Sequence, residues 1–363
     1  MAKRVIVDRW LFTVTVLLVF VGLVMVFSAS AVMARERLGS EYAFLSRQLL
    51  WAVAGLVTMV VAMRVDHRRY KHPALVFSVM GLTTLLLISV FFLDRSHHTH
   101  RWLHAGGFSF QPSELAKPVL ILFLAYFLAD RVKTMDDWRN TLLPAAAPVV
   151  VFLGLIVVEP DLGTAIACAG IAACVFYVAG MRLRYFGYAF GAAAVPLYFL
   201  LFQVAWRRDR LLAFWNPYAD RQKAGFHIIQ SLIAVATGGI AGTGLMEGKQ
   251  KLFYLPEPHT DFIFAVTAEE LGLVGAMFVL ALFAIFLWRG MRATWRTEDP
   301  FGRYLAVGIT SMIVLQALIN ISVVLGMMPT KGIPLPLVSY GGSSLFVTLA
   351  CVGVLLNITK HAE

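Results

Sequence analysis

Residues 251–275 read KLFYLPEPHTDFIFAVTAEELGLVG, and the rest of the chain is interpreted from this stretch. Its first half is polar and rich in turn-forming residues, and it ends at Asp261. An apolar run over 262–288 follows and carries two adjacent acids, Glu269 and Glu270. Carboxylates at the mouth of a membrane helix and inside it are costly to keep, so the pattern predicts a membrane protein that uses them.

The composition predicts an all-α polytopic membrane protein in one domain over residues 1–363. Of the 363 residues, 59% are hydrophobic and only 14% are charged, and the mean hydropathy is +0.76. A soluble domain has about 25% charged residues, so a chain this apolar requires a bilayer as its solvent. The net charge of +10 is spread over many short loops without an aromatic platform for bases, so we expect no nucleic-acid partner.

Charged residues and turn formers divide the chain into ten expected membrane-spanning helices. The first has an uncharged run longer than the apolar core of a signal peptide, so we expect it to remain as a span. The fourth is the least apolar, because it contains Glu114 and Lys117. The ten expected ranges are 10–33, 48–63, 73–93, 113–128, 141–158, 162–179, 185–205, 262–288, 304–328 and 343–359.

The basic residues of the loops orient these spans. Loops 64–72, 130–140, 181–184 and 289–303 hold 4, 3, 2 and 4 Lys and Arg, whereas the short loops 34–47, 94–112, 159–161 and 329–342 hold 3, 2, 0 and 1. Because short cytoplasmic loops are enriched in basic residues, both termini are predicted to be cytoplasmic and loop 206–261 to face outward. The unusual polar residues then fall on the outer side.

The long outward loop 206–261 is expected to be functional or partly helical, since structureless loops of this length are uncommon. Its apolar segment 226–236 is too short to span and suits a re-entrant or interfacial helix between the seventh and eighth spans. Arg210 has the fork geometry that binds phosphate, and the amides of glycines 238–244 could meet an anion. A solvated arginine cluster with a flexible glycine linker is the alternative.

Two further stretches place charge on the same side. In RWLHAGGFSFQPSELAK, residues 101–117, Glu114 and Lys117 lie on one helix face and can pair. They form either a structural ion pair or part of a cavity for a charged substrate. In EPDLGT, residues 159–164, Asp161 is either a helix N-cap or a residue of the same cavity. The histidines at 97, 98, 100 and 104 lack ordered metal-ligand spacing, so a solvated loop is expected there.

The last irregular stretch, 327–344, reads MMPTKGIPLPLVSYGGSS and interrupts two apolar runs. Irregular backbone at membrane depth is tolerated where it lines a cavity or packs on protein. Lys331 and Ser343 are therefore candidate cavity residues, with a plain outer loop as the alternative. Asn320 begins a glycosylation sequon, which we discount because it lies within the ninth expected span.

Together these motifs resemble the SEDS family (shape, elongation, division and sporulation). The similarity extends in order over nearly the whole chain and includes 101–117, EPDLGTA at 159–165, Gln230-Ser231, Gly238-Gly239, LPEPHTDFIFAVTAEELGLVG at 255–275 and PLPLVSYGGSS at 334–344. QKLFYLPEPHTDF at 250–262, Thr330-Lys331 and FSASAV at 27–32 resemble the division branch, which contains FtsW, more than the elongation branch, which contains RodA. Glu159 stands where many relatives have glutamine.

The resemblance implies a peptidoglycan glycosyltransferase in the bacterial cytoplasmic membrane. Such enzymes polymerise lipid II at the outer face and release undecaprenyl pyrophosphate. The family's essential aspartate corresponds to Asp261, the Glu and Lys of its QPSE motif to Glu114 and Lys117, and the aspartate of its PDLG turn to Asp161. The resemblance also implies partners, namely a class B penicillin-binding protein that supplies transpeptidation and other membrane proteins of the division complex.

The chemistry of these residues predicts their roles. Asp261 is the candidate base for a sugar hydroxyl, the ligand of a divalent cation (Mg²⁺ or Mn²⁺) shared with the substrate diphosphate, or both. A helix N-terminus lowers its basicity, whereas burial or nearby Glu257 raises its pKa. Lys117, Arg210 and Lys331 are candidates to neutralise the diphosphate.

Glu269 and Glu270 lie too deep for the same sugar contact. We expect at least one of them to face an interior polar network, with protonation of one because Lys and Arg are scarce in the spans. Two other functions are open from the sequence: a lipid II flippase and a non-catalytic scaffold. The outer position of the unusual residues and the lack of a repeated pair of interrupted helices favour the enzyme. A side-wall polymerase is the alternative to one of cell division.

Overall fold

The computed structural model describes residues 7–94, 101–105 and 108–361. The end residues needed to place the predicted cytoplasmic termini, and the histidines at 97, 98 and 100, lie outside this part of the chain. The helices are α1 (Arg9–Leu38), α2 (Ala43–Arg64), η1 (His67–Lys71), α3 (Pro73–Leu93), α4 (Pro112–Ala129), η2 (Val132–Thr134), η3 (Trp138–Leu142), α5 (Leu143–Val158), α6 (Leu162–Val178), α7 (Leu183–Phe202), α8 (Ala205–Trp215), η4 (Pro217–Asp220), α9 (Phe226–Gly238), α10 (Ile263–Arg296), α11 (Pro300–Val324) and α12 (Gly342–His361). A short antiparallel hairpin joins β1 (Leu103–Ala105) to β2 (Phe108–Phe110).

Within the described residues, nine helices are long and apolar enough to cross a membrane. The 17-residue helix α6 occupies the place of the sixth predicted span. The expected polytopic helical fold is therefore confirmed, whereas the β1–β2 hairpin was not predicted. The seventh span differs as well: α7 ends at Phe202 and α8 begins at Ala205, so the arginines of 207–210 lie on a helix of their own.

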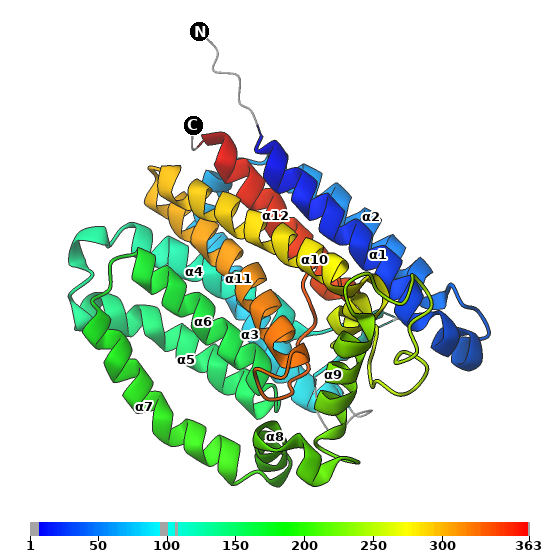
Figure 1. The fold of residues 1–363 in the computed structure, drawn as a ribbon. Helices are drawn as coiled ribbons and strands as arrows, with labels where there is room; N and C mark the ends of the chain where they lie inside the picture. Colours follow the sequence, from blue (N-terminus) through cyan, green and yellow to red (C-terminus); the bar gives the residue numbers. More distant parts are fainter. Residues whose placement is uncertain (1–6, 95–100, 106–107, 362–363) are drawn as a thin grey trace.

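The bundle is organised around α11, which is mostly buried and packs against α4, α6 and α10. Around it, α12 packs along α2, and α1 packs along α10. The start of α1 and the end of α12 lie at one end of the bundle, while α8 and α9 lie at the other (Figure 1). The helices of segment 206–261 are thus at the end of the bundle opposite to both chain ends.

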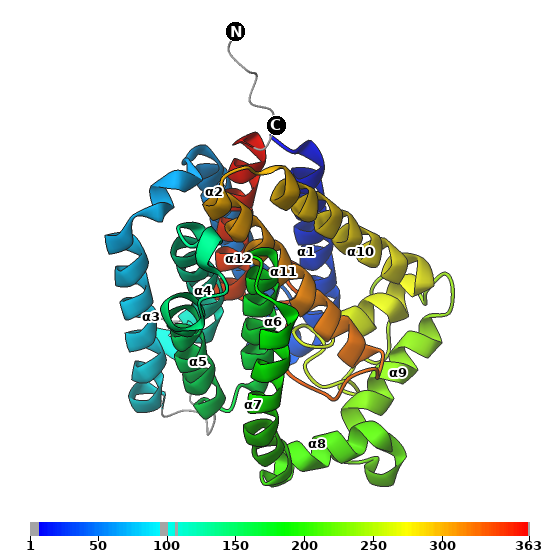
Figure 2. The same ribbon diagram turned by 90° about the vertical axis from the view of Figure 1, so that its left-hand side faces the viewer.

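Helix α7 lies at the edge of the bundle (Figure 2). None of its residues is buried, and its main packing partner is α8. An apolar helix that contacts so little protein requires lipid around it. The end of α7 that precedes α8 is therefore exposed to lipid.

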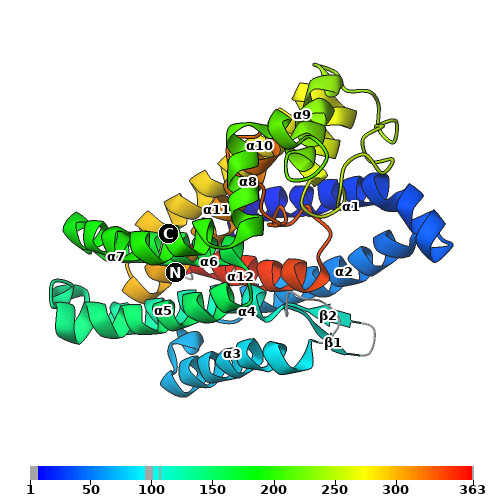
Figure 3. The ribbon, with the colours of Figure 1, turned by 90° about the horizontal axis from the view of Figure 1, so that it is seen from below.

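The glycines of 238–244 permit close packing of the outer segment on α10. Helix α9 packs on α10 beside the point where Gly272, with φ +66°, interrupts the helix (Figure 3). A Cβ on Gly242 would lie 2.1 Å from the Glu270 carbonyl oxygen, and one on Gly238 would lie 1.9 Å from that of Ala268. Neither a flexible linker nor an anion cradle is needed to explain these glycines, because backbone approaches backbone there.

Glu269 and Glu270 face the interior polar network that the sequence predicted. Glu269 accepts hydrogen bonds from the N–H groups of Lys249 and Gln250, and Glu270 pairs with Lys251 at 2.6 Å. Ser28 of α1 donates to Glu270. Protonation of one of the two acids was expected because no cation was predicted nearby. Lys251, in the segment before α10, supplies that cation and pairs with Glu270.

Candidate active site

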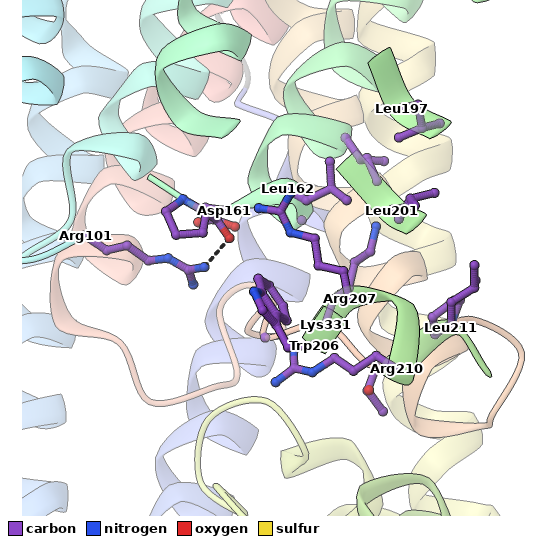
Figure 4. A pocket seen from close by; sticks show the side chains of 16 residues that line it. Arg101, Asp161, Leu162, Leu197, Leu201, Trp206, Arg207, Arg210, Leu211 and Lys331 are labelled. Carbon is purple, nitrogen blue, oxygen red and sulfur yellow. Dashed lines mark hydrogen bonds between the residues drawn. The ribbon is translucent and has the colours of Figure 1, made fainter. Parts of the chain in front are cut away.

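A cavity of about 180 Å³ lies at the end of the bundle that carries α8. Its walls come from the α5–α6 turn, the outer end of α7, α8 and the segment before α12 (Figure 4). The lining residues are Arg101, Pro160, Asp161, Leu162, Gly163, Ile166, Leu197, Leu201, Trp206, Arg207, Arg210, Leu211, Pro329, Thr330, Lys331 and Gly332. Four of these side chains are cationic and one is acidic, while the leucines form an apolar wall toward α7.

The cationic side chains come from three separate parts of the chain. Arg101 donates from Nε to the Glu159 carbonyl at 3.0 Å and from Nη2 to the Pro160 carbonyl, so it is fixed to the α5–α6 turn. Arg207 and Arg210 flank the Trp206 ring, at 5.0 and 5.2 Å from its centroid. The buried Arg207 Nε has no hydrogen-bond partner among the described residues. A compact anion is the ligand that such a cluster suits.

Asp161 has both of its predicted roles, as the N-cap of α6 and as a residue of the cavity. Its carboxylate caps α6 by accepting hydrogen bonds from the Thr164 N–H at 3.1 Å and the Thr164 hydroxyl at 2.8 Å. Gln111 donates to the same carboxylate at 3.2 Å. Asp161 also lines the cavity, so it holds the α5–α6 turn in place while adding one negative charge to a cationic wall.

Glu159 adds less charge than its position suggests. Its side chain is buried, and neither carboxylate oxygen has a hydrogen-bond partner among the described residues. Burial, with Asp161 nearby, raises the pKa of Glu159 to about 8. The shift favours the uncharged form of the Glu159 side chain.

Asp261 lies two residues before the start of α10 and is held through its main chain. Its carbonyl accepts a hydrogen bond from Asn320 at 2.7 Å, whereas no described residue donates to its carboxylate. That carboxylate lies against Gly332 of the cavity wall: a Cβ on Gly332 would be 2.8 Å from Asp261 Oδ2. Burial, helped by Glu257, raises the pKa of Asp261 to about 7, although Arg210 opposes the shift. A pKa near neutrality is the value that suits a general base.

Lys331 completes the cavity from the segment before α12. Its ammonium has no ion pair or hydrogen bond within the described chain, and it lines the same space as Arg207 and Asp161. Burial lowers the pKa of Lys331 to about 8. The segment 329–332 is thus part of the cavity wall rather than a plain outer loop.

Three other predicted site residues lie elsewhere. Lys117 bonds Glu114 at 2.8 Å and Gln316 at 2.8 Å, and Ser344 donates to Glu114 at 2.7 Å. Glu114 and Lys117 are buried in α4, and Ser343 is buried in the first turn of α12. None of the three lines the cavity, so the structure favours the structural-pair alternative for Glu114 and Lys117.

The sequence did not single out Arg101, Arg207 and Asn320 as separate site residues. For Asn320 the usable signal was an amide side chain in the middle of an apolar span, which indicates an internal polar contact. From the sequence, Asn320 was considered only as the start of a glycosylation sequon. Arg101 could not be placed from sequence, because its reach to the α5–α6 turn depends on the β1–β2 hairpin that the sequence did not reveal.

A second cavity, of about 350 Å³, lies between α2, α4, α11 and α12. The described residues that line it include Thr58, Tyr70 and Cys351 and otherwise apolar side chains, and none of them is charged. It therefore offers no charged side chain to a diphosphate or to a sugar hydroxyl that must lose its proton.

The contact between Asp261 and Gly332 gives a first prediction. Gly332→Ala should lower the rate of the reaction at this site by about 10-fold, because the new methyl group displaces the carboxylate. Steady-state turnover of the purified protein measures the change. Gly341→Ala is the matched control, since its added Cβ meets only Ser344 Cβ at 3.7 Å. Equal turnover in the two variants would contradict the placement of Asp261 at the cavity.

Comparison with known proteins identifies the family of this chain. Residues 8–363 match the family model FTSW_RODA_SPOVE, described as a cell cycle protein. The chain is 43% identical over 358 residues to the probable peptidoglycan glycosyltransferase FtsW of Geobacter sulfurreducens, covering 98% of this chain and 96% of that one. It is 40% identical over 362 residues to stage V sporulation protein E of Bacillus subtilis, covering 99% of each.

A solved structure has the same fold. Its subject is described as the structural coordination of polymerization and crosslinking by a peptidoglycan synthase complex. One of its chains superposes with a TM-score of 0.80 at 30% identity and covers 98% of both chains. With the family model matched over nearly the whole length, the chain belongs to the FtsW/RodA/SpoVE family of cell cycle proteins, the SEDS family that its motifs resemble.

Proposed function

We propose that this protein is a peptidoglycan glycosyltransferase of the FtsW type, which polymerises lipid II into glycan strands for cell division. The observation that carries the proposal is the unpaired Asp261 carboxylate, which does not itself line the cavity but lies against Gly332 in the wall of a cavity with four cationic side chains. The names of the relatives give the same activity. The undecaprenyl tail lies along the apolar wall of Leu197 and Leu201 on α7, and the diphosphate lies among the cationic side chains.

The transfer is a single displacement. Asp261 takes the proton from the 4-hydroxyl of the acceptor GlcNAc as that oxygen forms a bond to the anomeric carbon of the donor MurNAc. The bond from this carbon to the diphosphate breaks, and its electron pair leaves with undecaprenyl pyrophosphate. Arg207, Arg210 and Lys331 stabilise the negative charge that develops on the leaving group. Attack opposite to the leaving group inverts the anomeric centre.

The site fits a divalent cation brought with the substrate. Among the described residues, no group of three or more His, Cys, Asp or Glu side chains could hold a metal ion without the substrate. Mg²⁺ is commonly held by one or two carboxylates together with substrate phosphates, and the unpaired Asp261 carboxylate supplies such a ligand. When bound, Mg²⁺ or Mn²⁺ would neutralise charge on the diphosphate.

The proposal includes location and partners. The cavity lies at the outer face of the bacterial cytoplasmic membrane and both termini lie in the cytoplasm, a location that the positive-inside pattern of the loops supports. A class B penicillin-binding protein crosslinks the product, which the solved synthase complex supports, and other division proteins join the pair. A side-wall role of the RodA type is the alternative, and depletion of the protein separates the two: filamentous cells indicate division, and rounded cells indicate elongation.

The two shifted pKa values predict a bell-shaped pH profile. Asp261 must be deprotonated to act as base, so kcat/KM should rise with pH through about 7. Lys331 must be protonated to bind the diphosphate, so kcat/KM should fall through about 8. Lys331→Arg should remove the alkaline limb, because a guanidinium stays charged. An alkaline limb unchanged in Lys331→Arg would contradict the role of Lys331.

A flippase for lipid II is the competing function, and detergent separates the two. The purified protein is mixed in detergent with lipid II, Mg²⁺ and a purified class B penicillin-binding protein whose transpeptidase serine is replaced. No bilayer is present, so a flippase produces nothing there, whereas a polymerase yields glycan strands. Lipid II left unpolymerised, together with its transport across reconstituted vesicles, would refute the polymerase.

A further inference from the structure

Residues 259–261, which precede the N-cap of α10, are held by groups from the C-terminal part of the chain. The His259 carbonyl accepts the Tyr340 N–H at 2.9 Å, and the Thr260 carbonyl accepts the Ser339 hydroxyl at 2.5 Å. The Asp261 carbonyl accepts from the Asn320 side chain at 2.7 Å. Three successive main-chain carbonyls are thus fixed, which locates Asp261 without using its carboxylate.

Unlike Tyr340 and Ser339, Asn320 donates hydrogen bonds to two separate segments of the site. Its Nδ2 donates to the Asp261 carbonyl and to the Ile333 carbonyl, each at 2.7 Å. Ile333 follows Lys331 and Gly332, which line the cavity. One amide group therefore joins the segment that carries the candidate base to the segment that carries a candidate diphosphate ligand.

The orientation of this amide is fixed by its surroundings. Both neighbours are carbonyl oxygens, which can only accept, so the NH₂ group and not the amide oxygen must face them. Asn320 is 2% exposed, and its amide oxygen has no hydrogen-bond partner among the described residues. A buried amide oxygen without a hydrogen bond lowers the stability of the fold. The two hydrogen bonds that Asn320 donates explain why an amide is found in this apolar span.

We propose that Asn320 is a positioning residue for glycosyl transfer, which sets the separation of Asp261 from Lys331 through its bridge between the Asp261 and Ile333 carbonyls. The proposal rests on the proposed function. Displacement of a reacting group by about 1 Å costs as much as 100-fold in rate. Because Arg101, Arg207 and Arg210 still bind the diphosphate when the bridge is lost, its loss should lower kcat and leave KM nearly unchanged.

The test is a comparison of kcat and KM for lipid II polymerisation in Asn320→Leu and the parent. Leucine keeps the branched shape of the side chain without a donor. We expect kcat to fall about 10- to 100-fold while KM stays within about twofold. Ser231→Ala is the matched control: Ser231 is also buried and donates to a main-chain carbonyl of α11, that of Val324, at 2.7 Å. Its kcat should stay near that of the parent.

A kcat within about twofold of the parent in Asn320→Leu, a loss confined to KM, or an equal loss in Ser231→Ala would overturn the proposal. If Asn320→Leu does not fold, Asn320→Gln replaces it, since the longer arm displaces the bridge. A lowered kcat at unchanged KM then supports the proposal, and an unchanged kcat refutes it.

Hydrogen exchange separates this inference from the proposed function. A parent that makes no glycan refutes the function, yet amide exchange at 329–333 still reports the bridge. Exchange there should be faster in Asn320→Leu and unchanged in Ser231→Ala. Equal exchange in Asn320→Leu and the parent would show that the amide does not hold the segment.

Discussion

Asp261→Asn should reduce kcat for lipid II polymerisation by about 100-fold or more, the lower end of what a positioned base contributes. The substitution keeps the shape of the side chain and removes its ability to take a proton. Because the Asp261 main chain is fixed by Asn320 and its carboxylate accepts no hydrogen bond from the described residues, the fold should not change. The measurement is the rate of glycan formation in detergent with thermal unfolding of both proteins as a check.

Glu257→Gln is the matched control for this prediction. Glu257 is exposed and lies in the same turn, where its charge helps to raise the pKa of Asp261. Its removal should shift the acid limb of the pH profile to lower pH, because less repulsion opposes ionisation of Asp261, and should leave the maximal rate near that of the parent. A maximal rate in Asp261→Asn close to that of Glu257→Gln would show that Asp261 is not the base.

The second large effect concerns stability. Glu114→Ala should destabilise the protein by about 3–5 kcal/mol, because removing one partner of a buried ion pair leaves the other charge uncompensated. Both side chains are almost fully buried, at 6% and 4% exposed. The thermal unfolding midpoint in detergent should therefore fall, and the double variant Glu114→Gln/Lys117→Met should recover most of the loss since no charge then remains.

Asp130→Ala is the control, since it breaks the exposed pair with Lys71 and should cost about 1 kcal/mol or less. The same variants also test the older alternative that Glu114 and Lys117 bind substrate. Polymerisation by the stable double variant at a rate near that of the parent supports a structural pair. A stable double variant without activity would return both residues to the substrate site.

Much of the fold was predictable because it depends on local composition. The apolar runs, the charges between them and the short helix of 226–236 are each visible within a few residues of sequence. The break between α7 and α8 was missed, because nothing in the hydropathy of 185–205 marks a change of direction. Lys251 was missed as the partner of Glu270 because the two meet only when the outer loop folds back onto α10.

Some residues of the candidate site could likewise be predicted from local sequence, and others could not. Asp261, Asp161 and Lys331 were found because each lies in a polar interruption at a helix end, and Arg210 because it belongs to an arginine cluster. Glu114 and Lys117 were grouped with them, since both lie near the same surface in sequence. Only the packing of α4 against α11 shows that Gln316 and Ser344 satisfy this pair away from the cavity.

Photo-crosslinking with lipid II that carries a diazirine next to the diphosphate tests most directly whether the α8 cavity is the substrate site. The parent protein is irradiated with this probe in detergent, and labelled peptides are mapped by mass spectrometry. Label is expected on 160–166, 197–211 and 329–332, and excess unlabelled lipid II should displace it. Label confined to the uncharged cavity between α2 and α12, around Thr58 and Cys351, would contradict the account.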